Sequence, residues 1–215
     1  RGHAEFLLEY DEAAAGEDEV KLVEKRLMQG VRGGFKHAAG QPVGLGVITG
    51  ELSAEDGLLL VSEPDMVAFP IRYVRGVTRA AQYLAAQKPV LDSLEKAAGL
   101  VPDYPSILDS ALVCKRLGEG LGILERAEKG TRDTGWFAGC RDPKHDHNDP
   151  GQLERISVYE LLRRRPECVP YLPLWVGCKI VLTGKAPLII ADAKLGLKLK
   201  AGSPLAQAGA RVESR

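Results

Sequence analysis

Several features that would point to particular partners are scarce in this 215-residue sequence. There is no net charge, because 29 basic side chains are balanced by 29 acidic ones. A protein that binds polyanions needs a clustered positive excess, so direct nucleic-acid binding is not expected. No apolar run approaches the ~18–20 residues of a membrane span, and the N-terminus lacks the basic, apolar and small-residue series of a signal peptide. These absences predict a cytoplasmic protein that contacts neither nucleic acid nor a membrane.

Metal-ligating residues are few. The four cysteines, Cys114, Cys140, Cys168 and Cys178, form no C-x-x-C pair, and we expect reduced thiols. Cys140, His145 and His147 are residue types that zinc accepts. Their C-x4-H-x-H spacing matches no common closed zinc site, and they lie in a polar loop. The sequence therefore predicts no metal and no cofactor.

Catalytic motifs are also lacking. No G-x-S-x-G elbow occurs, and the glycines of Gly44–Gly50 lie inside a strand-like run without the spacing of a dinucleotide loop. The cysteines Cys114 and Cys178 lie in apolar runs, where burial makes a thiol inert. We expect no catalytic residues and no enzymatic activity. The alternative that stays open is a metal-assisted hydrolase that uses Cys140, His145 and His147.

The composition is that of a globular protein, with 45% hydrophobic and 27% charged residues. A chain of this length suits two compact domains. The stretch Gly99–Pro105 holds one Gly and two Pro and is the predicted boundary. We expect an α+β fold of two small domains in tandem, each with a short, mostly antiparallel sheet and packed helices. The predicted ranges are 1–100, 106–200 and a flexible, Gly-, Ala- and Ser-rich tail at 201–215.

Hydrophobic periodicity places the elements of the first domain. A stripe formed by Val20, Val23, Leu27 and Val31 predicts a helix. The other predictions are a strand at 4–10, a hairpin of the runs 43–49 and 58–61, a helix at 75–86, and a further helix that Pro89 begins and Gly99 ends.

The second domain is predicted in the same way. A strand pair is expected at 111–115 and 122–125, followed by an extended segment at 134–138 and a polar surface loop at 141–151. Ser157 and Glu160 have the spacing of a capping box, which predicts a helix from Val158 to about Arg165, before Pro166. Two further strands are expected at 176–182 and 188–190.

One block has turn chemistry followed by a large aromatic residue. Asp133 and Thr134 precede Gly135, and then come Trp136 and, three residues on, Gly139. An Asp side chain accepts N–H bonds two residues on, and Gly allows the torsions of the turn. The residues alone favour a structural motif in which Trp136 anchors a strand in the core.

The same block carries a family resemblance. A strand ending in Val113-Cys114, the D-T-G-W block with Gly139, the helix around Tyr159-Glu160-Leu161 and the Arg165-Pro166-Glu167 segment together resemble bacterial polymorphic-toxin immunity proteins with a D-[ST]-G-W domain. The resemblance covers about 111–183, and the layout is similar to two-domain immunity proteins of type VI secretion systems. Thr134 replaces the usual Ser, and Cys140-Arg141-Asp142 replaces the usual acidic position. The resemblance implies a non-catalytic inhibitor that binds a cognate secreted toxin, with a nuclease as the expected toxin.

Candidate contact residues lie in and beside the polar loop. Aromatic and Arg side chains are favoured at interface hot spots, and loops carry recognition. The candidates are Trp136, Arg141, Asp142, Asp146 and Asp149. The three Asp could imitate nucleic-acid phosphates in a nuclease cleft. A cytoplasmic scaffold or regulatory binding module remains the alternative function.

Overall fold

The computed structural model describes residues 3–142 and 144–215, and the chain divides into two compact units. Unit 1 is Arg1–Ala86 and unit 2 is Gln87–Arg215. The division falls inside α2 (Thr78–Asp92), not at 99–105. The sequence assigned a new helix to Pro89, but α2 continues through this proline. Pro removes one backbone donor and commonly ends or kinks a helix, which is why the pattern placed a break there.

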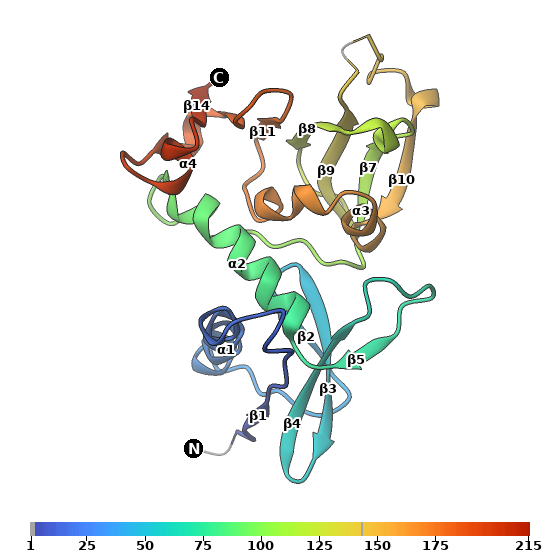
Figure 1. Ribbon diagram of the computed structural model, residues 1–215, viewed down its shortest axis with the longest axis vertical. Helices are drawn as coiled ribbons and strands as arrows, with labels where there is room; N and C mark the ends of the chain where they lie inside the picture. The colour runs from blue at the N-terminus through green and yellow to red at the C-terminus, as the bar shows by residue number, and fades with distance from the viewer. Residues whose placement is uncertain (1–2, 143) are drawn as a thin grey trace. The chain divides into compact units, whose positions relative to one another are not determined.

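Unit 1 is built on a five-stranded sheet (Figure 1). The strand order is β1-β4-β3-β2, and β5 also pairs with β4. Only the β1–β4 pair is parallel. The elements are β1 (Phe6–Leu7), α1 (Glu17–Arg32), β2 (Pro42–Leu45), β3 (Ile48–Glu55), β4 (Leu58–Pro64), β5 (Tyr73–Arg75) and the first part of α2.

The hydrophobic stripe of α1 forms as expected, because Val20, Val23 and Leu27 are buried. The expected hairpin is β3–β4, with the turn at Asp56 and Gly57. The run 43–49 is not one strand: Gly46, at φ 86°, turns the chain so that Leu45 pairs with Ile48. A Gly with positive φ is the residue that a two-residue hairpin turn requires.

Unit 2 is built on a seven-stranded mixed sheet of order β10-β7-β9-β8-β11-β12-β14. The pairs β7–β9 and β12–β14 are parallel and the rest are antiparallel. Its strands are β7 (Ser110–Cys114), β8 (Leu121–Arg126), β9 (Asp133–Cys140), β10 (Leu153–Ser157), β11 (Cys178–Val181), β12 (Leu188–Ala191) and β14 (Arg211–Ser214). A two-stranded sheet pairs β6 (Leu94–Glu95) with β13 (Lys198–Leu199).

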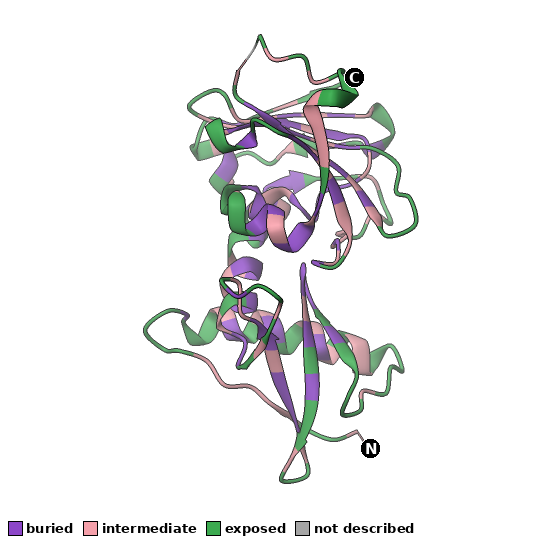
Figure 2. Ribbon diagram, turned by 90° about the vertical axis from the view of Figure 1, so that its right-hand side faces the viewer, coloured by how far each residue is buried: buried purple, intermediate pink, exposed green. Residues whose placement is uncertain are grey.

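The helices of unit 2 are short. They are α3 (Val158–Arg164), α4 (Pro204–Gln207) and the 3₁₀ helices at Leu117–Glu119, Pro150–Gln152, Pro166–Tyr171 and Ala193–Leu195. Ser157 caps α3 as expected, since its hydroxyl accepts from the Glu160 N–H at 3.1 Å. The Glu160 carboxylate pairs with Arg164 one turn on. Figure 2 shows the buried positions running along the strands and along one side of the helices.

Two features of unit 2 differ from the sequence-based expectation. The strands β7 and β8 do not pair with each other, because β9 lies between them and pairs with both. The segment 201–215, expected to be a flexible tail, contains α4 and the edge strand β14, which pairs with β12 over Leu188–Ala191. Strand order is set by tertiary packing, which local patterns do not contain. The α+β class is confirmed, and no helix in 3–142 or 144–215 is long and apolar enough to cross a membrane.

Candidate metal centre and its surroundings

Two cysteines lie at the same edge of the unit 2 sheet. Cys114 is the last residue of β7 and Cys140 is the last residue of β9. The two strands are parallel neighbours, and Val113 is in register with Ala138. Parallel neighbours bring their carboxyl ends to one edge, so the two thiols meet there although 25 residues separate them in sequence. Both are buried, at 0% and 3% exposure.

The polar loop after β9 brings two histidines to the same edge. Three Asp residues, Asp142, Asp146 and Asp149, each accept the backbone N–H two residues on, all at 2.9 Å. Such turns fold the chain back over short distances. His145 and His147 lie between them, and both rings are partly buried rather than solvated.

The four side chains converge. His145 Nδ1 is 3.0 Å from Cys114 Sγ and 3.4 Å from Cys140 Sγ. His147 Nε2 is 3.4 Å from Cys140 Sγ. One ligand atom from each of the four residues lies within 4.8 Å of the other three. The sequence predicted no metal site here. Its candidate ligands were Cys140, His145 and His147, without Cys114.

Polar groups around the cluster orient it. The second ring nitrogen of His145, Nε2, lies 3.3 Å from Gln152 Oε1. The backbone N–H of Arg116 donates to Cys114 Sγ at 3.3 Å. The Arg116 guanidinium also bonds the Asp142 carboxylate at 2.9 Å, which ties the segment after β7 to the loop after β9.

Packing fixes the position of the second histidine. The His147 ring meets Phe137 edge-on, with ring centroids 5.5 Å apart. A Cβ on Gly139 would lie 2.5 Å from Ile123 Cγ2 and 3.0 Å from His147 Cε1, so the glycine leaves the space that His147 uses. Burial lowers the pKa of His147, and neighbouring His145 lowers it further. Burial raises the pKa of Cys140, although the Asp142 N–H opposes this.

This arrangement is poorly suited to nucleophilic catalysis. A thiol 3.0 Å from an imidazole has the geometry of an activated nucleophile. Cys114 is fully buried, however, and a nucleophile must reach its substrate. Four converging S and N atoms instead have the composition of a closed metal site.

The D-T-G-W block lies at the opposite, amino end of β9. Asp133 Oδ1 accepts the Gly135 N–H at 2.9 Å, and its carboxylate pairs with Arg155 of β10. Thr134 Oγ1 donates to the Ser110 carbonyl at 2.9 Å. Gly135 has φ 74°, and a Cβ there would lie 2.2 Å from the Ala127 carbonyl oxygen. These contacts join three adjacent strands.

Trp136 belongs to the core of unit 2, with 1% exposure. Its indole N–H donates to the Leu172 carbonyl at 3.1 Å. The buried Arg126 guanidinium lies 5.3 Å from the ring centroid and pairs with Asp103 at 3.1 Å. The sequence proposed Trp136 both as a core anchor and as a contact residue, and its burial places the side chain away from the surface.

The other proposed contact residues are accessible. Arg141, Asp146 and Asp149 are exposed, and Asp142 is half-buried beside Arg116. Arg141 also lines a hollow of about 240 Å³ together with Tyr171, Glu167 and Lys185. The sequence did not single out Tyr171, because it lies in a 3₁₀ segment far from the loop.

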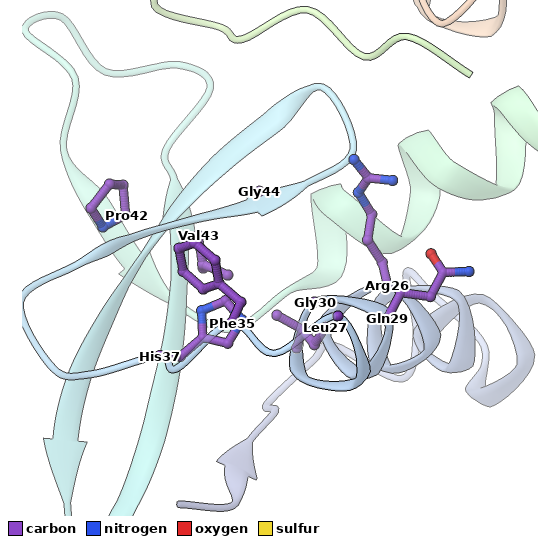
Figure 3. A pocket seen from close by; sticks show the side chains of 10 residues that line it. Arg26, Leu27, Gln29, Gly30, Phe35, His37, Pro42, Val43 and Gly44 are labelled. Atoms are coloured by element: carbon purple, nitrogen blue, oxygen red, sulfur yellow. The ribbon is translucent and has the colours of Figure 1, made fainter. Parts of the chain in front are cut away.

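Unit 1 contains a larger hollow between α1 and β2, of about 540 Å³ (Figure 3). Phe35 and His37 lie side by side in it, with ring centroids 4.9 Å apart. Neither ring nitrogen of His37 has a hydrogen-bond partner within the described residues. The lining combines apolar residues, among them Leu27 and Val43, with the polar side chains of Arg26 and Gln29.

Comparison with known proteins identifies one domain. Residues 102–190 match the family model of the Imm33-like domain. The matched segment is less than half of the chain. The matched segment contains the whole 111–183 region of the sequence resemblance and runs from before β7 almost to the end of β12. The match suggests an immunity protein. Neither the curated proteins nor the solved structures give a match to the chain.

Proposed function

We propose that this chain is an immunity protein that neutralises a cognate secreted antibacterial toxin by stoichiometric binding, without catalysis of its own. The observation that carries the proposal is the match of residues 102–190 to the Imm33-like domain. That segment supplies six of the seven strands of the unit 2 sheet. We further propose that the toxin is a nuclease delivered by a type VI secretion system, and that binding takes place in the cytoplasm.

The proposed contact surface is the polar loop and the hollow beside it. Arg141 belongs to both, because it follows Cys140 in the chain and lines the hollow with Tyr171. Arg and Tyr are, with Trp, the side chains that are enriched among interface hot spots. The turns at Asp146 and Asp149 restrict the conformations of the residues that they span, and a preorganised surface loses less entropy on binding.

The exposed carboxylates give the surface its proposed selectivity. One carboxylate oxygen of Asp146 and one of Asp149 each accept the backbone N–H two residues on, at 2.9 Å. Both side chains are exposed, so within the described part of the chain their carboxylates are accessible to a basic partner. A nuclease cleft is basic because it binds phosphates, and paired acidic groups would raise the association rate as well as the affinity.

The primary test uses the full chain and the product of the neighbouring gene. Coexpression should restore growth in cells that produce the toxin, and the two purified proteins should elute as one complex of fixed stoichiometry. Failure of both rescue and complex formation would overturn the immunity proposal. Rescue without a nuclease activity in the toxin would overturn only the nuclease part.

A charge variant tests the surface. Replacing Asp142, Asp146 and Asp149 with Asn keeps the side-chain carbonyl that each turn uses but removes three negative charges. We expect at least tenfold weaker binding that is less sensitive to salt. The matched control changes three exposed acids of unit 1, Glu12, Glu24 and Glu51, to Gln. Equal affinities for the two triple variants would show that the loop charges do not contact the toxin.

A further inference from the structure

We propose that unit 2 binds one zinc ion, held by Cys114 Sγ, Cys140 Sγ, His145 Nδ1 and His147 Nε2. The site would be structural and would fasten the polar loop to the carboxyl ends of β7 and β9. The inference concerns the metal alone and does not depend on toxin binding.

The spacing of the ligand atoms fits a tetrahedral ion. Zinc binds thiolate sulfur at ~2.3 Å and imidazole nitrogen at ~2.0 Å, so neighbouring ligand atoms are separated by about 3.3–3.8 Å. The S–N distances here are 3.0, 3.4 and 3.4 Å, and all four atoms lie within 4.8 Å of one another. The widest pair of ligand atoms, up to 4.8 Å apart, would have to close by about 1 Å to complete the tetrahedron.

The surrounding hydrogen bonds select the ligand atoms. A histidine that binds a metal through one nitrogen usually donates its other N–H to an acceptor. Gln152 Oε1 lies 3.3 Å from His145 Nε2 and can accept that N–H. The lone pair is then on Nδ1, the atom that faces both sulfurs. Gln152 therefore acts as a positioning residue for His145.

A backbone N–H supports negative charge on one of the two sulfurs. Arg116 N–H donates to Cys114 Sγ at 3.3 Å. A bond from an N–H to a thiolate is charge-assisted and stronger than one to a thiol. Zinc binding would displace one proton from each thiol to solvent, with no change of oxidation state. Two thiolates and two neutral imidazoles around Zn²⁺ leave a site of zero net charge, which suits its burial.

The number of protein ligands makes the site structural. A catalytic zinc keeps one position open for water or substrate, whereas four protein ligands close the shell. The two cysteines come from strand ends and the two histidines from one loop, so the ion would join three chain segments. Because Cys140, His145 and His147 would all bind the ion, the metal would hold this part of the loop in place in addition to the Asp turns.

The first experiment measures metal in the full-length protein purified under reducing conditions without chelators. We expect about one zinc per chain by elemental analysis. Replacement by Co²⁺ should give the absorption of a tetrahedral site with two thiolate ligands. Less than a tenth of an equivalent after incubation with zinc, or a cobalt spectrum of octahedral type, would overturn the proposal. A Cys114–Cys140 disulfide that persists under these reducing conditions would also overturn the proposal.

Variants identify the ligands. Cys114→Ser and His147→Asn should each lower zinc affinity at least a hundredfold, and Cys168→Ala, a buried thiol outside the cluster, should leave it unchanged. Gln152→Leu should weaken binding about 10–100-fold but keep the tetrahedral cobalt spectrum, because it removes no ligand. Unchanged affinity in His147→Asn would exclude that ligand and with it the proposed site.

A second measurement avoids variants that fail to fold. In the unaltered protein, a zinc chelator should lower the thermal midpoint and expose the 141–151 loop to protease, and added zinc should reverse both changes. A chelator that changes neither, in a protein that contains zinc, would show that the metal lies elsewhere.

Discussion

Different side-chain contacts surround the two ends of the parallel strand pair β7–β9. At the amino end, Asp133, Thr134 and Gly135 meet Arg155 and Ser110 through hydrogen bonds and an ion pair that the chain satisfies by itself. At the carboxyl end, four S and N atoms of Cys114, Cys140, His145 and His147 lie within 4.8 Å of one another. The amino end is thus held by hydrogen bonds and an ion pair within the polypeptide, whereas the carboxyl end has the composition of a metal site.

The largest effect on stability is expected from substitution of Trp136, which is buried in the core near the amino end of β9. Trp136→Ala removes a fully buried indole and its bond to the Leu172 carbonyl. We expect a loss of about 3–5 kcal/mol in the free energy of unfolding, measured by urea denaturation. Trp136→Phe, which keeps most of the volume, should cost much less. Equal losses would mean that the indole N–H bond, and not packing, dominates.

A smaller but still large effect is expected from the turn itself. Gly135→Ala would force a side chain into φ 74° and place its Cβ 2.2 Å from the Ala127 carbonyl oxygen. Strain of this kind costs about 1–3 kcal/mol, and the clash adds to it. Gly118→Ala is the matched control, because a Cβ there would meet nothing within 4 Å. Similar urea midpoints for the two variants would contradict the structural role of the motif.

These two positions also show what the sequence could predict. The turn at Asp133–Gly135 and the core role of Trp136 follow from local chemistry, as do α1 and the Ser157 cap of α3. The family resemblance over 111–183 rested on the same block, and the domain match covers it. Local patterns were sufficient for the Asp133–Gly135 turn and the Ser157 cap because each depends on residues two or three positions apart. The core position of Trp136 follows from its large apolar side chain.

The carboxyl end could not be predicted in the same way. Cys114 became a candidate ligand only because β9, and not β8, lies beside β7. Ligand spacing read along the chain finds pairs such as His145 and His147, but a cysteine 26 positions before Cys140 has no such signal. The one available sign was that both cysteines end apolar, strand-like runs, which would place them together if the strands were parallel neighbours.

Substitution of Gly139 tests the carboxyl end of the β7–β9 pair separately from its amino end. Gly139→Ala would place a Cβ 3.0 Å from His147 Cε1 and 2.5 Å from Ile123 Cγ2, so His147 must move. Overpacking costs about 1–3 kcal/mol, and zinc affinity should fall at least tenfold by competition with a chromogenic chelator. Gly44→Ala in unit 1, where a Cβ meets nothing, should change neither quantity. A Gly139→Ala protein that is destabilised but binds zinc normally would show that His147 is not a ligand.

The smallest effect is a pH dependence at the amino end. Burial acts to raise the pKa of Asp133, but the Gly135 N–H and the Arg155 guanidinium outweigh it and hold the pKa below its usual value. A carboxyl whose pKa is lowered on folding contributes stability above the unfolded pKa of about 3.9, and this is lost as pH falls through the lower, folded value. Asp133→Asn keeps the turn but loses the ion pair, at a cost of about 0.5–1 kcal/mol near neutral pH.

The measurement is the difference in unfolding free energy between the Asn variant and the unaltered protein, followed from pH 7 downward in urea. The difference should shrink as pH falls below the ordinary Asp range, because protonated Asp133 and Asn then resemble each other. Arg155→Met should reproduce the loss at neutral pH and add little to Asp133→Asn in the double variant. A difference that stays constant with pH would mean that the charge of Asp133 does not stabilise this end of the strand pair.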